Sequence, residues 1–525
     1  MSRALALRAP HPGALVALAL AGLAALAFGA LIAAAQDRPS VLALDAYLRR
    51  ILVFSLAQAA LSTALSLGLG AALALALARR RFPGRELALA ALGAAAVMPA
   101  IVVVFSVVAV YGRSGWLAAA AAAIGLEARP DPFGWPGILL AHVFLNAALA
   151  ARVFLDALAR APAEHWRLAA ILGFGPRATF AHLDWPILKR ETPGLAGLVF
   201  LLCFTSFAIV LTLGGGPGKA TLEVAIFSAL RVELDFARAA MLAGLQLAVC
   251  LSLTLALHWA VTRAPVAPTE RLPVARPDAA DPRLRRLDVV ILAAGAALVL
   301  PLLAATLQGL GALPRVLDAD LVGAALTSAA IAFVSATLAC AMATALAGAA
   351  RAARARRRGR LAAAYDVLPA LVLAIPPFAL TAGLFLLLRG RVGPTEAGFV
   401  LLPLVNAIGA LPFAYRFVAP ALATSAERYG RLAALLGLSG LRRLAIVDWP
   451  MLRRPLAGAF AFSAALSFGD FGIVALFGGG TLRTVPYLLY ERLGAYRLDE
   501  AAAIGLLLVA AAFALSAFAT RMARC

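Results

Sequence analysis

The chain has 525 residues, of which 63% are hydrophobic and 14% charged, and its mean hydropathy is +0.93. Soluble proteins are about half apolar and about a quarter charged, so this composition excludes a soluble globular fold. The formal net charge of +21 does not indicate nucleic-acid binding, because the basic residues form short clusters between apolar blocks. We therefore predict an all-α integral membrane protein embedded in a lipid bilayer, with no nucleic-acid partner.

Apolar blocks long enough to cross about 30 Å of hydrocarbon recur along the whole chain. They lie at 14–35, 51–78, 87–111, 137–158, 195–213, 237–261, 288–309, 321–350, 362–388, 398–420, 456–477 and 500–520. If every block crosses, most of the 47 Lys and Arg residues face one side. This bias predicts about twelve membrane-spanning helices with both termini cytoplasmic. The first block also resembles a cleavable signal peptide, but its apolar run is longer than usual, and we expect it to be retained.

A long internal repeat divides the chain. The segment 206–216 resembles the segment 470–480, and the same step of 264 residues relates 184–186 to 448–450. A repeat of half the chain predicts two tandem six-helix domains of equal topology, at 1–262 and 287–525. The Pro-rich, charged stretch 263–286 is typical of a linker, which we place in the cytoplasm. The pathway of a fused pseudo-dimer is expected between its two copies.

The longest inner loops, at about 160–192 and 421–455, carry one motif twice. Gly173 precedes Pro186 by 13 residues, and Gly437 precedes Pro450 by the same step. We expect a short helix to end at each Gly, which suits a left-handed cap. A second helix should begin after the turn, and the Pro should then stop or redirect the chain.

These two loops resemble the signature loop of ABC importer permeases, in which Glu-Ala-Ala, a Gly and a Pro follow the same spacing. In that family the loop docks into a groove on a cytoplasmic ATPase. The resemblance implies an ATPase-coupling role for Ala169, Gly173, Asp184, Trp185, Pro186, Ala433, Gly437, Asp448, Trp449 and Pro450. Arg167 and Arg431 stand in place of the family's Glu, so an ion-pair role for that Glu is not carried over.

Within that class, the chain is most similar to the fused permeases for thiamine and thiamine pyrophosphate of the bacterial inner membrane. Ferric-iron permeases share this architecture and form the alternative. The resemblance implies alternating access, two copies of an ATPase that bind ATP and magnesium, and a periplasmic binding protein that delivers the solute. The closest string to an ATP-binding loop, 214–220, lacks the required first Gly and the final Ser or Thr. The chain itself is therefore not expected to be an enzyme or to hold a cofactor.

Asp470 is the most informative residue inside a predicted span. It lies beyond the midplane toward the outer leaflet, and an ionisable group at such depth usually faces a bundle interior or a cavity. If the solute is cationic thiamine, neighbouring aromatic faces could add cation–π contacts. The candidate pathway residues are Asp470, Ser206, Phe207, Phe468 and Phe471. The alternative for Asp470 is a purely structural role, in which its carboxylate only accepts hydrogen bonds from the backbone. For the whole chain, a proton-coupled transporter is a further alternative. No catalytic constellation or metal site is predicted.

Overall fold

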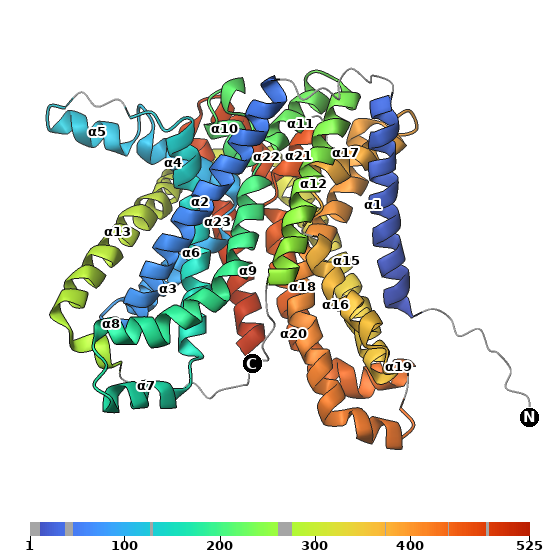
Figure 1. Ribbon diagram of the computed structural model, residues 1–525. Coiled ribbons are helices and arrows are strands. Elements are labelled where there is room, and N and C mark those ends of the chain that lie inside the picture. Colours follow the sequence, from blue (N-terminus) through green and yellow to red (C-terminus); the bar gives the residue numbers. More distant parts are fainter. Residues whose placement is uncertain are drawn as a thin grey trace, which may run out of the picture.

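The computed structural model describes residues 11–36, 46–126, 130–260, 276–372, 374–438, 440–478 and 482–524. These residues form a bundle of long helices (Figure 1). Within them, ten helices are long and apolar enough to cross a membrane, or eleven if one bent pair counts as a span. The predicted all-α membrane fold is confirmed. The basic N-terminal residues 1–10 and the part 263–275 of the predicted linker lie outside the described residues.

The helices of the first half are α1 (Pro12–Gln36), α2 (Ala46–Arg79), α3 (Arg85–Val97), α4 (Ala100–Tyr111), α5 (Trp116–Ala123), α6 (Trp135–Ala159), α7 (Ala163–Ile171), α8 (Pro176–Thr179), η2 (Phe180–Asp184), α9 (Trp185–Phe204), α10 (Ala208–Leu213), η3 (Pro217–Lys219), α11 (Leu222–Arg231) and α12 (Phe236–Ala260). The helices that follow are η4 (Pro277–Ala280), α13 (Pro282–Leu307), η5 (Gln308–Ala312), α14 (Leu313–Val316), α15 (Ala319–Ala355), α16 (Gly359–Val372), α17 (Pro377–Leu388), α18 (Pro394–Leu435), α19 (Gly440–Arg443), η6 (Leu444–Asp448), α20 (Trp449–Phe468), α21 (Gly472–Phe477), α22 (Val485–Gly494) and α23 (Leu498–Arg524).

The predicted block 195–213 accounts for the difference between twelve spans and eleven. Its residues belong to α9, a 20-residue helix, and to the short α10. Lys189, Arg190 and Glu191 lie inside α9, and the chain is not helical at 205–207. Charge at one end and a break at the other leave no single apolar helix long enough to cross. Helices α9 and α10 together run from the end that carries α8 to near the opposite end (Figure 1). The bent pair is α16 and α17, whose axes differ by 91°.

The order of helices repeats along the chain. The series α2, α6, α9, α10, α11 and α12 recurs as α15, α18, α20, α21, α22 and α23. Helices α2 and α6 pack against each other as α15 and α18 do. The break at 205–207 recurs at 469–471, between α20 and α21. The fold thus follows the repeat found in the sequence.

The first helix of each half packs on the other half. Helix α1 lies against α17 and α15, and helix α13 lies against α2, α3 and α4. The contact of α1 with α17 is close at Gly383, where an added Cβ would stand 2.2 Å from the carbonyl oxygen of Ala27. On α13, a Cβ added to Gly295 would stand 2.6 Å from a methyl group of Leu73. Small residues at these crossings allow the backbones to approach, which interlocks the halves.

The α1–α17 crossing yields a test. We expect Gly383→Ala to destabilise the protein by about 1–3 kcal/mol, because the new methyl group overlaps the backbone of α1. Gly409→Ala is the control, since Gly409 also lies inside a helix and has open space where a Cβ would be added. Thermal unfolding in detergent measures both variants. Equal unfolding temperatures for the two would contradict the interlocked packing of α1.

Candidate coupling elbows and solute pathway

Five aromatic side chains meet where the two halves face each other. They form the aromatic cluster: Phe207, Phe227, Phe378, Phe471 and Tyr490. The ring centroid of Phe207 lies 4.4 Å from that of Phe378 and 6.0 Å from that of Phe471. The rings of Phe471 and Tyr490 are 4.8 Å apart. Phe207, Phe378 and Phe471 are buried, so rings from both halves are in direct contact at this level.

The cluster follows the internal repeat. Phe207 and Phe471 occupy the two breaks, at 205–207 and 469–471. Phe227 lies on α11 and Tyr490 on α22, which are equivalent helices of the two halves. Phe378 comes from α17 and contacts both Phe207 and Phe227. The cluster therefore joins four residues from equivalent elements of the two halves and one unmatched residue.

Asp470 lies on the second break, next to Phe471. Its Oδ1 accepts a hydrogen bond from the backbone N–H of Gly472, with a nitrogen–oxygen distance of 3.2 Å. Its Oδ2 is buried and has no hydrogen-bond partner among the described residues. A buried carboxylate oxygen without a partner is costly, so it marks a position where a cation or a donor from a solute would be stabilised.

Of the predicted pathway residues, the structure brings together Phe207, Phe471 and Asp470. Ser206 lies on the first break, at the position equivalent to Asp470. Phe468 differs, because it packs between the main core and a small separate cluster formed by Ala332, Ala336 and Ala464. Within the described residues, no ring contact joins Phe468 to the aromatic cluster.

Several residues of this region were not predicted from the sequence. Phe227 and Tyr490 lie at equivalent positions of α11 and α22, five residues after the first residue of each helix. Their step of 263 residues differs by one from the repeat step, which would pair Phe227 with Glu491, so the repeat alone did not identify them. Glu223 was also missed: it is a second buried carboxylate, whose Oε1 accepts a hydrogen bond of 2.8 Å from the amide of Gln246. No sequence signal pointed to Phe378, because its place in the cluster depends on the bend between α16 and α17.

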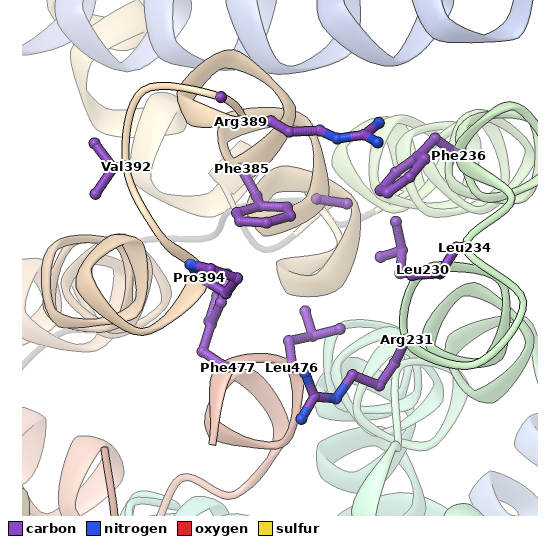
Figure 2. A pocket seen from close by; sticks show the side chains of 12 residues that line it. Leu230, Arg231, Leu234, Phe236, Phe385, Arg389, Val392, Pro394, Leu476 and Phe477 are labelled. Atoms are coloured by element: carbon purple, nitrogen blue, oxygen red, sulfur yellow. The ribbon is translucent and has the colours of Figure 1, made fainter. Parts of the chain in front are cut away.

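Residues of α11, α17 and α21 line a pocket of about 370 Å³ (Figure 2). Figure 1 shows these three helices at one end of the bundle. We call this cavity the mouth pocket. Residues of both halves line it, among them Arg231 of α11 and Arg389 at the end of α17. Figure 1 places α7 and α19 at the opposite end. The aromatic cluster and the mouth pocket share α11 and α17, so they are neighbours along these two helices.

The first elbow, residues 163–186, turns at Gly173. Gly173 has a φ of +65°, and Gly437 of the second elbow, residues 427–450, has a φ of +63°. In each elbow two backbone hydrogen bonds close the helix end, and the carbonyl groups of Ala169 and Ala433 accept one of them. This double-bonded cap requires a left-handed residue, which explains the Gly. The predicted helix ends at both glycines are confirmed.

The helix before the turn differs between the elbows. Helix α7 has nine residues, as expected, but in the second elbow the helix that ends before Gly437 is α18, which has 42 residues. The prediction of a short helix is therefore wrong there. The first elbow has Pro162 before α7, and Pro disfavours helix in the preceding residue. The equivalent position in the second half is Ala426, so α18 continues.

The prediction was that Pro186 and Pro450 stop or redirect the chain, and a stop is wrong at both positions. Each Pro is in the first turn of the next helix, α9 or α20, and that helix follows a π-helical turn, η2 or η6, without interruption. Pro has no N–H to donate, and its ring crowds the preceding turn. A local change from α to π hydrogen bonding accommodates both effects, and such turns are frequent at functional sites.

Asp184 and Asp448 are fully buried and ion-paired. The Arg276 guanidinium donates two hydrogen bonds to Asp184, at 3.0 and 2.7 Å, and lies 4.4 Å from the ring centre of Trp166. Burial raises the pKa of the Asp184 carboxyl above its usual value, and Arg276 opposes this shift by stabilising the charged form. Asp448 instead accepts from Arg351 at 2.8 Å and from Ser425 at 2.7 Å.

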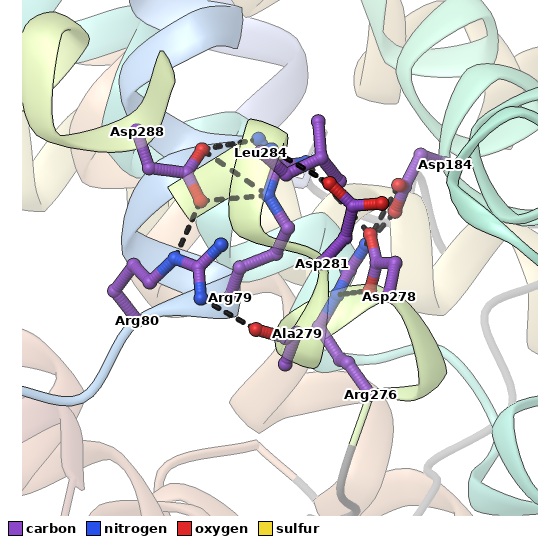
Figure 3. A network of polar contacts seen from close by, with 9 residues as sticks. All are labelled: Arg79, Arg80, Asp184, Arg276, Asp278, Ala279, Asp281, Leu284 and Asp288. Carbon is purple, nitrogen blue, oxygen red and sulfur yellow. Dashed lines mark hydrogen bonds and ion pairs between the residues drawn. The ribbon is translucent and has the colours of Figure 1, made fainter. Parts of the chain in front are cut away.

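Arg276 belongs to a larger network at the first elbow (Figure 3). It also pairs with Asp278 of η4, while Asp288 of α13 pairs with Arg79 and Arg80 at the end of α2. The charges balance, because three arginines face three aspartates, and all six side chains are largely buried. The described part of the predicted linker is therefore folded against the first elbow.

Both elbows expose large apolar side chains. Ile171 is 82% exposed at the first elbow, and Leu435 is 85% exposed at the second. Leu168, Leu172, Leu432 and Leu436 are also exposed. They lie beside basic residues such as Arg167 and Arg431, at the end of the bundle rather than along it. Clustered apolar side chains with polar neighbours are typical of a protein–protein contact surface.

Comparison with known proteins shows which proteins this chain resembles in sequence. No protein-family model matches the chain. The chain is 42% identical over 515 residues to the thiamine transport system permease protein ThiP of Brucella melitensis, covering 96% of this chain and 94% of the relative. It is 40% identical over 504 residues to ThiP of Escherichia coli strain K12, covering 95% and 93%. It is 35% identical over 463 residues to ThiP of Haemophilus influenzae, covering 87% and 86%.

A repeated bundle of membrane helices with an elbow in each half, together with these relatives, defines a class: the chain is an ABC transporter permease, a multi-pass protein of the inner membrane. The identity extends over nearly the whole length of both proteins. The chain belongs to the family of thiamine transport system permease proteins. A ferric-iron permease is not favoured, since these relatives are named for thiamine.

The pairing of Arg276 with Asp184 yields a second test. Arg276→Gln leaves a buried carboxylate without its cation, and we expect a loss of about 3–5 kcal/mol in stability. Arg283→Gln is the control, because Arg283 is exposed and lies in the same segment. The double variant Arg276→Gln with Asp184→Asn should recover part of the loss. Thermal unfolding of the purified permease measures all three, and an unchanged midpoint for Arg276→Gln would refute the role of this pair.

Proposed function

We propose that this chain is the membrane permease of an ATP-driven importer that moves thiamine or its phosphates across the inner membrane by alternating access. The observation that carries this proposal is the pair of elbows with exposed apolar faces, in a chain whose relatives are named thiamine transport permeases. In this cycle the two domains, 1–262 and 287–525, rotate against each other and so open the pathway first to one side of the membrane and then to the other. A periplasmic binding protein delivers the solute at the end that carries the mouth pocket.

The elbows are the contact points for two copies of a cytoplasmic ATPase, one on each half. This assignment places both elbows and both chain termini in the cytoplasm. ATP and magnesium bind to the ATPase copies, and the permease contributes no bond chemistry. Exposed Ile171 and Leu435 supply apolar area that a protein groove would bury, which is the main favourable term in most associations.

One helix connects each elbow to the aromatic cluster. Helices α9 and α20 have 20 residues each, which corresponds to about 30 Å of axial length. Helix α9 begins at the first elbow and ends just before Phe207, and α20 begins at the second elbow and ends just before Asp470. A displacement of either elbow therefore reaches the break through one continuous helix, which contains Pro193 in α9 and Pro455 in α20.

The solute crosses where Asp470 and the aromatic cluster lie. Thiamine contains a cationic thiazolium ring, and the buried, unpartnered Oδ2 of Asp470 supplies the opposite charge. The rings of Phe207 and Phe471 offer faces for cation–π contact. In this structure these rings touch, so the cluster separates the two sides of the membrane and must open during transport.

Substitution at the elbows tests the coupling. Ile171→Asp and Leu435→Asp each place a charge where an apolar contact is expected, and each should strongly reduce ATPase capture during purification of the permease. The control is Leu126→Asp, because Leu126 is 59% exposed but lies outside both elbows. Retention of full ATPase binding and full transport in both elbow variants would show that the exposed side chains serve another purpose.

Substitution of Asp470 tests the solute pathway. Asp470→Asn keeps the size and the hydrogen bond to Gly472 but removes the charge. A charged hydrogen bond contributes about 1.5–3 kcal/mol, so uptake of thiamine at low concentration should fall by about tenfold or more. Ser206→Ala, at the equivalent position of the other half, should change uptake little. Wild-type affinity and rate for Asp470→Asn would remove Asp470 from the solute path.

A further inference from the structure

The mouth pocket continues the solute pathway outward from the aromatic cluster. On α17, Phe378 of the cluster and Phe385 and Arg389 of the pocket follow one another at steps of seven and four residues, so they share one helix face. From Phe378 to Arg389 this face extends about 16 Å along the axis. On α11, Phe227 of the cluster is four residues before Arg231 of the pocket.

The mouth pocket carries positive charge, whereas the break at 469–471 carries the carboxylate of Asp470. The pocket lining includes two guanidinium groups, Arg231 and Arg389, and no carboxylate. Arg389 lies 4.3 Å from the ring centre of Phe236, and Arg231 donates to the carbonyl of Gly478 at 3.3 Å. Within the described chain, no ion pair is recorded for either guanidinium. Figure 2 shows the two side chains on different sides of the pocket.

Two unpaired guanidinium groups over aromatic and aliphatic walls fit an organic anion. Arginine binds phosphate through two parallel N–H donors, and its positive charge is fixed at any physiological pH. A carboxylate at depth and guanidinium groups at the mouth together fit a solute with a cationic ring at one end and an anionic group at the other. Free thiamine has only the cationic ring, whereas its phosphate esters have both charges.

We infer that the mouth pocket is an anion subsite, in which Arg231 and Arg389 bind the phosphate groups of a phosphorylated thiamine whose ring points toward Asp470. This inference rests on the proposed transport of thiamine and adds the residues that distinguish the phosphorylated solute from the free one. The pocket volume of about 370 Å³ suits part of such a solute, with the remainder reaching the cluster.

The test compares two solutes in one reconstituted system of permease, ATPase and binding protein in lipid vesicles. Uptake of labelled thiamine and labelled thiamine diphosphate is measured for the unaltered chain and for Arg231→Gln and Arg389→Gln. We expect uptake of the diphosphate at low concentration to fall by about tenfold or more, with free thiamine within about twofold. The binding protein is the same throughout, so its own preference cancels in the ratio.

Matched variants separate local binding from general electrostatics and from misfolding. Arg391→Gln removes an exposed charge from the same loop but not from the pocket lining, and it should leave both uptakes unchanged. Arg389→Lys retains the positive charge and should lose less diphosphate uptake than Arg389→Gln. Retained thiamine uptake shows that each variant folds.

The outcomes distinguish the two proposals. If Arg231→Gln and Arg389→Gln reduce both uptakes equally, or change neither, the anion subsite is refuted while the proposed transport stands. If the unaltered complex transports neither solute, the proposed function itself fails. A selective loss of the diphosphate supports both.

Discussion

The bilayer imposes the constraint on which this structure depends: backbone amides that leave a helix inside the membrane must be covered by protein. The chain interrupts its helices at 205–207 and 469–471, and both interruptions lie at the contact between the halves. There the rings of Phe207 and Phe471 cover them, and Asp470 accepts a backbone N–H. Irregular backbone, aromatic rings and a buried carboxylate oxygen therefore occur together at the contact between the halves, and this supports the proposed position of the solute pathway.

The two copies have diverged at the elbows while keeping the same turn. Both retain the left-handed Gly, the π-helical turn and a buried Asp. The first elbow has its own short helix after Pro162 and is held by Arg276 from the segment between the halves, whereas the second extends α18 and is held by Arg351 of its own half. An ATPase on the first elbow would thus act on both halves, and an ATPase on the second would act mainly on one.

The two halves of the chain are not independent units, because helices α1 and α13 each pack on the opposite half. The ion pairs of Asp288 also hold the start of α13 against the end of α2. A rocking motion of the halves must therefore carry the partner's first helix with it. The ends of the halves that carry the elbows are tied by charge, while the opposite ends meet around the mouth pocket, whose two arginines form no ion pair among the described residues.

The sequence by itself determined the helical membrane fold, the repeat and the turns at Gly173 and Gly437, because apolar length, recurrence and left-handed backbone are local properties. It also indicated Phe207, Phe471 and Asp470, since the repeat marks their positions. Only the tertiary structure decided that Phe378 joins them, that Phe468 does not, and that Arg276 pairs with Asp184. These contacts join residues far apart in the chain, and they depend on helix bends and crossings that no local pattern encodes.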